Sequence, residues 1–159
     1  EFLKHIRPAQ EGLLAEAVGE SELGANLLHL AQAEVNEANS HTASLCLATL
    51  TNLASVGASF ALASQGALSV LVDGILADDP PTVYYAAACL QNIISEPSVL
   101  DSYALMHYLS STPMEERLRA LSRVPNAHMA AVARGALSNF NQSPQRAEPI
   151  ASTKIQAAV

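Results

Sequence analysis

Apolar residues recur along this chain at a spacing of three, four and three positions, and the same four-residue stripe occurs three times. Each stripe ends beside an asparagine, which is Asn52, Asn92 or Asn139. This spacing follows one side of an α-helix and differs from the alternation of a β-strand, so each stripe predicts a helix with one buried face. The three stripes are Ala43, Cys46, Leu50 and Leu53; Val83, Ala86, Leu90 and Ile93; and Ala130, Ala133, Leu137 and Phe140.

The stripes return at nearly regular intervals, because their asparagines lie 40 and 47 residues apart. A helical period of roughly 40 to 47 residues is typical of stacked repeats, in which each unit buries its apolar face against its neighbours. We therefore expect an all-α fold of about three repeats with an incomplete N-terminal unit, over residues 1–142. Residues 143–159 begin with prolines among polar neighbours, and we expect a flexible C-terminal tail there.

Turn and capping residues divide the chain into further helices. Gly57 is expected to end one helix, and Thr82 to cap the long helix that follows the acidic turn of residues 78–81. The expected helices span residues 22–36, 41–55, 59–64, 67–76, 83–95, 97–110, a segment that begins near Pro113, and 127–142. We expect the core at Leu45, Leu50, Leu53, Leu68, Leu71, Leu76, Val83, Leu90, Ile93, Leu118, Leu121 and Leu137.

The second repeat carries the most specific motif. Residues 65–76 read Gln-Gly-Ala-Leu-Ser-Val-Leu-Val-Asp-Gly-Ile-Leu, and residues 86–93, after the acidic turn, read Ala-Ala-Ala-Cys-Leu-Gln-Asn-Ile. This sequence resembles the armadillo repeat, and the resemblance covers roughly residues 22–142, where the first and third repeats match mainly in their last helix. The related HEAT arrangement of helix pairs is the alternative. The resemblance implies a right-handed superhelix whose third helices line a concave groove, with asparagines that bind the backbone of an extended peptide.

The helix face around each asparagine is small and polar, and an amide offers both a donor and an acceptor to a peptide backbone. The candidate peptide-binding residues are Ala48, Asn52, Tyr85, Ala88, Asn92, Gly135, Asn139 and Gln142. The alternative is that the asparagines only hydrogen-bond the neighbouring repeat and hold the stack together. Importin-alpha-type proteins carry Trp four positions before the asparagine, where this chain has Ala or Gly, so their mode of binding nuclear-localisation peptides is not expected here.

Charge and composition narrow the partners to proteins and peptides. A net charge of −7 and a pI near 5.1 argue against binding to nucleic acid or anionic membranes. No uninterrupted apolar run reaches the roughly 20 residues of a membrane span, and no signal peptide is recognisable, so we expect a cytoplasmic or nuclear protein. Cys46 and Cys89, at equivalent places in successive repeats, are expected to be core thiols.

Catalytic patterns are missing from the sequence. The five histidines lack metal-ligand spacing, and neither a nucleophile elbow nor a phosphate-binding loop occurs, so we expect no enzyme activity, cofactor or metal. Two function classes follow. The first is an adaptor that binds a peptide or partner protein along the third helices. The second is a structural module, a piece of a longer solenoid, that self-associates through its ends, at Leu13, Leu14, Leu23 and Leu27 or at residues 150–159.

Overall fold

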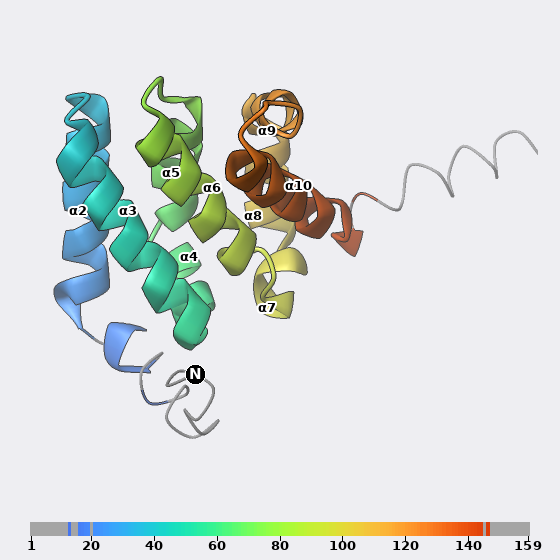
Figure 1. Ribbon diagram of the computed structural model, residues 1–159. Helices are drawn as coiled ribbons and strands as arrows, with labels where there is room; N and C mark the ends of the chain where they lie inside the picture. The colour runs from blue at the N-terminus through green and yellow to red at the C-terminus, as the bar shows by residue number, and fades with distance from the viewer. Residues whose placement is uncertain (1–12, 14–15, 20, 145, 147–159) are drawn as a thin grey trace, which may run out of the picture.

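The computed structural model describes residues 13, 16–19, 21–144 and 146 of the chain. All regular elements in these residues are helices, which confirms the all-α prediction for this part of the chain (Figure 1). They are α2 (Glu22–Asn36), α3 (Ser40–Leu53), the π-helical segment η2 (Ala54–Ala58), α4 (Ser59–Ser64), α5 (Ala67–Leu76), α6 (Pro80–Ile93), α7 (Pro97–Leu100), α8 (Tyr103–Ser110), α9 (Met114–Leu121) and α10 (Ala127–Asn141).

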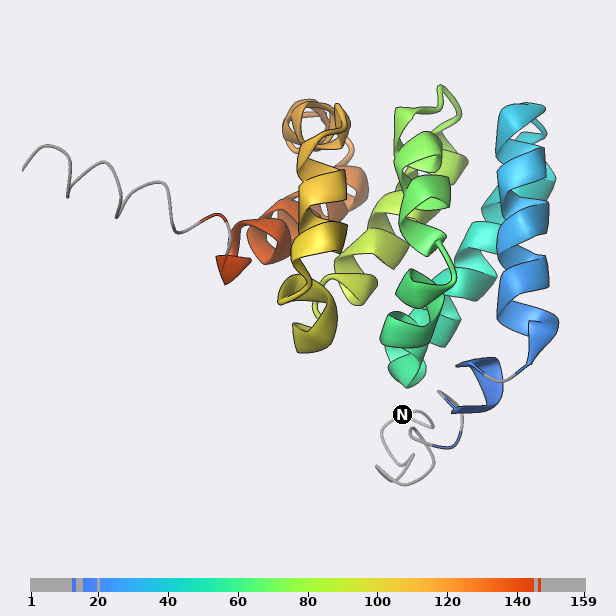
Figure 2. The same cartoon turned by 180° about the vertical axis from the view of Figure 1, so that it is seen from behind.

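The helices form two layers. In the front layer of Figure 1, α3 packs against α6, and α6 packs against α10. The view from behind shows α2, α5 and α8 side by side in the second layer (Figure 2). Contacts also join α2 to α3, α5 to α6 and α9 to α10, so each front helix has a partner behind it.

The three apolar stripes point into the space between the layers, as predicted. All of their members are buried except Leu53 and Leu137, which are partly buried against the same core. Small residues let the layers approach closely, because a methyl group on Gly74 of α5 would collide with the Ala86 side chain of α6. Removal of this apolar surface from water is the main force that holds the two layers together.

Two of the predicted core positions are wrong. Leu45 is 55% exposed and Leu76 is 38% exposed, whereas the other predicted core residues are buried or partly buried. Leu76 is the last residue of α5, where the helix reaches the edge of the layer. Leu45 lies within α3, two residues before the fully buried Leu47, and a residue at that spacing points to the opposite side of a helix.

The helix predicted over residues 83–95 begins three residues earlier, at Pro80. Its N-cap is Asp79, whose Oδ2 accepts hydrogen bonds from the backbone N–H of Thr82 at 2.9 Å and from the Thr82 hydroxyl at 2.7 Å. Pro80 and Pro81 fit the first turn because a helix leaves the N–H groups unpaired there. The prediction that Thr82 caps this helix is therefore wrong. The cap is Asp79, and Thr82 donates its hydrogen bonds to Asp79.

Two more helix predictions change in detail. The helix predicted over residues 97–110 is divided into α7 and α8, and Ser102 between them caps α8 by accepting a hydrogen bond from the Leu105 N–H at 3.4 Å. Helix α3 ends at Leu53, and the chain continues directly through η2 into α4. Gly57, the predicted stop, breaks the helix with a φ of 103°, a conformation that glycine adopts at little cost.

The helical stretch Ser40–Ser64 has the length and composition of a membrane span, with a mean hydropathy of 1.6 over its most apolar window. The sequence analysis predicted no membrane span because it considered only uninterrupted apolar runs. The mean hydropathy over an 18-residue window can be high even where serines and threonines stand between the leucines. Core helices pass the same test. This stretch is broken at Gly57, and Leu47, Leu50 and Leu62 are buried between the layers, but only 39% of the most apolar window is buried inside the protein.

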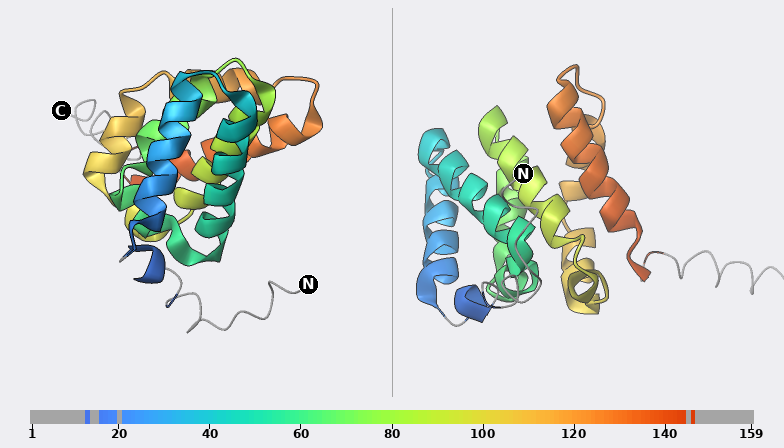
Figure 3. Two further views of the ribbon diagram at one scale, coloured as in Figure 1. Left: turned by 90° about the vertical axis from the view of Figure 1, so that its left-hand side faces the viewer. Right: turned by 60° about the horizontal axis from the view of Figure 1, so that its bottom comes forward.

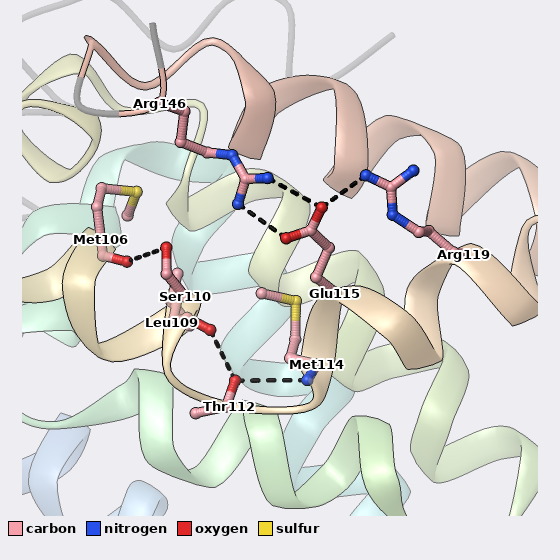
Figure 4. A network of polar contacts seen from close by, with 8 residues as sticks. All are labelled: Met106, Leu109, Ser110, Thr112, Met114, Glu115, Arg119 and Arg146. Atoms are coloured by element: carbon pink, nitrogen blue, oxygen red, sulfur yellow. Dashed lines mark hydrogen bonds and ion pairs between the residues drawn. The ribbon is translucent and has the colours of Figure 1, made fainter. Parts of the chain in front are cut away.

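The last described residues are attached to α9 and α10 (Figure 4). Arg146 contacts both carboxylate oxygens of Glu115, at 2.8 and 2.9 Å, and its guanidinium lies 4.3 Å from the centre of the Phe140 ring. Arg119 binds the same carboxylate at 2.7 Å. Burial alone would raise the pKa of Glu115, but hydrogen bonds and charges from the two arginines outweigh it and lower that pKa. Packing therefore continues to Arg146, and residues 145 and 147–159 of the predicted tail lie outside the described residues.

Candidate binding surface

The asparagines of the predicted row lie on the three front helices and link neighbouring helices. Nδ2 of Asn92 on α6 donates a hydrogen bond to the backbone carbonyl of Thr51 on α3, at 3.3 Å. Nδ2 of Asn139 on α10 donates to the backbone carbonyl of Gln91 on α6, at 2.9 Å. In both cases the acceptor is the residue directly before the asparagine of the preceding front helix. The same contact is thus made at both joints of the front layer.

Asn52, the first asparagine of the row, has a different environment. It is exposed on α3, and its side chain makes no hydrogen bond within the described residues, where no front helix precedes α3. Asn92 and Asn139 are half-buried, and their bonds fix the orientation of each amide. An amide has two N–H groups and one carbonyl oxygen, so each of these two side chains keeps Oδ1 and one N–H that the joint does not use.

The small residues beside the row differ in the space they leave. Ala48 and Ala88, four positions before Asn52 and Asn92, are half-buried. Gly135 lies under the side chain of Gln91, because a methyl group at Gly135 would collide with that amide. Gln142, also predicted here, is exposed just after α10. Gly135 therefore lies beside a glutamine side chain of the neighbouring helix, and its role in peptide binding stays a prediction.

Thr51 and Gln91 contribute to the surface but were missed by the sequence analysis. Each supplies the carbonyl that an asparagine binds, and the Thr51 hydroxyl also donates to the carbonyl of Tyr85, at 3.2 Å. A signal for them is present, because the residue before each asparagine of the row is polar. The sequence analysis considered only the helix face that carries the asparagine. The preceding residue lies about 100° away around the helix and was therefore not included.

Tyr85, the predicted aromatic residue, is half-buried at the joint between α3 and α6. Its ring makes an edge-to-face contact with Tyr84, with centroids 5.2 Å apart and planes at 79°. Ser59 provides another link across the stack, because its buried hydroxyl donates to the carbonyl of Asn92 at 3.3 Å. Ser59 lies on α4, so this hydrogen bond joins α4 to the end of α6 next to the asparagine row.

Two open pockets of about 280 Å³ flank the turn between α5 and α6, away from the asparagines. One lies beside the turn between α2 and α3, where Oε2 of Glu34 is buried without a hydrogen-bond partner in the described residues. The other lies between the start of α6, α9 and the start of α10, and Arg117 lines it while donating to the carbonyls of Ile75 and Ala77. Both pockets are shallow features of the turn edge, and none of the row asparagines lines them.

The titratable groups of the described residues include two buried thiols. No group of three His, Cys, Asp or Glu side chains there could hold a metal ion. Cys46 and Cys89 are buried free thiols, as predicted. Burial raises the pKa of Cys89 from 9.0 to about 12, although a hydrogen bond with the Thr51 side chain opposes the rise. Burial and, secondarily, the charge of Glu34 also raise the pKa of Cys46, so neither thiol is an activated nucleophile.

In its described residues the protein is all-helical and two-layered. Its front helices are linked by the same kind of hydrogen bond, from an asparagine side chain to a backbone carbonyl of the preceding front helix. Comparisons with models of protein families, with curated proteins and with solved structures find no match to this chain. The function has to be inferred from the geometry of the front layer itself.

Proposed function

We propose that this protein is an armadillo-like, right-handed solenoid that acts as a protein-protein interaction adaptor. It binds an extended peptide, or a flexible segment of a partner protein, across α3, α6 and α10. The observation that carries the proposal is the asparagine contact, which joins equivalent residues at both joints of the front layer. A surface that repeats once per unit is long and shallow, and it suits an extended chain better than a compact small molecule.

The chemistry of the row suits a peptide backbone. The joint bonds hold the amides of Asn92 and Asn139 in place, so their remaining carbonyl and N–H groups need no further ordering before they pair with a ligand. Ala48 and Ala88 leave room for a chain to lie close to these amides. No residue of the predicted set is charged, so the ligand is recognised by its backbone hydrogen bonds and by contacts near Tyr85.

The test begins with a display library of random 12-residue peptides, selected on the full chain. The affinity of a selected peptide is then measured with the wild type and with Ala48→Arg, which fills the surface beside the row without removing a joint bond. Loss of one backbone hydrogen bond in a partly buried groove costs about 1 to 3 kcal/mol, so Asn92→Ala should weaken binding about tenfold or more. Ala48→Arg should weaken it at least as much, because it excludes the peptide.

Asn141→Ala is the matched control, since Asn141 is an exposed asparagine of α10 that lies outside the row. It should leave the affinity unchanged. Asn92→Ala also loses its bond to Thr51, so its unfolding must be measured beside its affinity. If Ala48→Arg keeps full affinity and Asn92→Ala affects only stability, the row serves solely to join the helices and the adaptor proposal fails.

A further inference from the structure

The turns from α2 to α3, from α5 to α6 and from α9 to α10 lie along one edge of the stack, at the top of Figure 1 and of the left view in Figure 3. Between neighbouring turns lie the two pockets of about 280 Å³. We call the one beside the starts of α6 and α10 the α6–α10 pocket. Its wall is mainly apolar and includes Pro80, Val83, Leu121, Val124 and Met129. This volume equals that of about nine water molecules, so it suits a ligand of about ten non-hydrogen atoms.

Arg117 of α9 is the cation of this wall. It is half-buried, and its Nε and Nη2 donate to the carbonyls of Ile75 and Ala77, at 3.4 and 3.3 Å, which fixes the guanidinium in place. Neither N–H of Nη1 takes part in these bonds. The ion pairs of the described residues join Glu115 to other arginines, so within this part of the chain Arg117 has no carboxylate at ion-pair distance. The guanidinium is therefore available to an anion from outside.

Asp78 and Asn126 are the other polar residues of the wall, and both are exposed. Oδ1 of Asn126 accepts a hydrogen bond from the Met129 N–H at 3.0 Å, which leaves Nδ2 as a further donor. The charge of Asp78 opposes an anion, but water and salt screen an exposed charge more than a half-buried one. The pocket at the other joint has the opposite character, because its charged lining residues are Glu34, Asp78 and Asp79. Of the two pockets, the α6–α10 pocket is therefore the one that suits an anion.

We propose that the α6–α10 pocket binds a small amphiphilic carboxylate, such as a medium-chain fatty acid. The carboxylate pairs with Nη1 of Arg117, and the hydrocarbon chain lies against the apolar wall. A hydrogen bond between a guanidinium and a carboxylate is stronger than one between neutral groups, and burial of the chain adds affinity. The net charge of −7 repels an anion at a distance, but physiological salt screens charges beyond about 8 Å, so the residues of the wall decide the binding.

This pocket lies away from the asparagine row, so its test is independent of the adaptor proposal. The probe is sodium octanoate, kept below the concentration at which it forms micelles, and the readout is the methionine-methyl NMR spectrum of the full chain. The Met129 signal should shift and saturate, whereas the signal of Met106, which is buried outside the pocket, should not. Octanol should bind more weakly and octylamine more weakly still, because a neutral group or a cation replaces the carboxylate.

Variants separate the charge from the apolar wall. Arg117→Gln should weaken octanoate binding about tenfold or more, to the level of octanol, because the cation is lost. Arg134→Gln is the matched control, since Arg134 also donates to a backbone carbonyl but lies outside the pocket, and it should leave the affinity unchanged. Asp78→Asn should strengthen octanoate binding about twofold, because it removes a like charge. Val124→Phe narrows the pocket without removing a bond of Arg117, and it should weaken octanoate and octanol alike.

If Arg117→Gln does not fold, the comparison of octanoate with octylamine tests the charge in the wild type. A Met129 signal that octanoate does not move, equal affinity for octylamine, an equal shift of Met106, or unchanged octanoate binding in Val124→Phe would each overturn the proposal. Tighter binding of the dipeptide acetyl-Ala-Leu than of octanoate would also overturn it, because the pocket would then recognise the C-terminal end of a peptide.

Discussion

A side-chain amide can serve two partners at once, and the asparagine row depends on this property. One N–H of Asn92 closes the joint to α3, which leaves its other N–H and its Oδ1 unused by that joint. A residue with a single donor or acceptor could not combine these contacts. The structural and the ligand-binding interpretations of the row are therefore compatible, and only variants that separate the two contacts can distinguish them.

The ionisation of Cys89 is coupled to folding, because burial raises the pKa of this thiol in the folded chain. Below pH 9 both the folded and the unfolded chain keep its proton, so this thiol adds no pH dependence. Between its ordinary pKa of 9.0 and the folded value of about 12, only the unfolded chain loses the proton. The free energy of unfolding should therefore fall as pH rises above 9.

Urea unfolding between pH 8 and pH 10.5 measures this effect, with Cys89→Ala as the reference. In Cys89→Ala the free energy of unfolding should fall less steeply with pH, because the variant lacks the thiol whose pKa differs between the folded and the unfolded chain. Thiol reagents provide a second readout, since Cys89 should react only after unfolding. Equal slopes in both proteins, or rapid modification of native Cys89, would contradict the high pKa in the folded state.

At the scale of the elements, the acidic turn shows how the chain begins a front helix. Asp79 binds two donors of Thr82, and the prolines that follow prevent the helix from starting earlier without loss of a hydrogen bond. On the other side of the turn, Arg117 of α9 donates hydrogen bonds to the carbonyls of Ile75 and Ala77 at the end of α5. The turn between α5 and α6 is thus fixed by contacts from both sides.

Asp79→Ala should destabilise the protein by about 1 kcal/mol, which is the usual contribution of an N-cap. Asp78→Ala is the control, because it removes the same charge one residue earlier and Asp78 is exposed and accepts no capping bond. Chemical denaturation followed by circular dichroism measures both variants. Similar losses for the two would show that the charge of the turn, and not the cap, is what stabilises α6.

At the scale of the whole molecule, the two ends of the stack differ. The outer helix α10 exposes Arg134, Ser138 and Asn141, while α2 and α3 expose Leu23, Leu30 and Leu45. The core between them runs through both layers without interruption, so the units should unfold together. This coupling follows from packing, because each front helix contributes its stripe to a core shared with its neighbours.

Leu90→Ala tests the shared core, since Leu90 is fully buried on the central front helix. It should lower the free energy of unfolding by about 2 to 5 kcal/mol, because a cavity remains where the side chain was. Leu76→Ala, at an exposed position, should cost much less. Thermal unfolding of both variants should stay a single transition, and a separate early transition in Leu90→Ala would show that the units are independent.

The sequence by itself determined the local features of this protein. Stripe spacing set the helices and their buried faces, and glycine at position 57 predicted the break that the positive φ produces. The sequence also predicted that Cys46 and Cys89 are core thiols, because both lie between apolar neighbours in a helix. These features depend on residues within one helix, and so the order along the chain is enough to predict them.

Only the tertiary structure decided which helix faces have a neighbour. Leu45 and Tyr85 stand at equivalent positions, yet one is exposed and the other packed, because α6 has a helix before it and α3 has none in the described residues. Gly135 is covered for the same reason, since the side chain of Gln91 reaches it from the neighbouring helix. Contacts between helices join residues about 40 positions apart, and helical periodicity carries no information about partners at that distance.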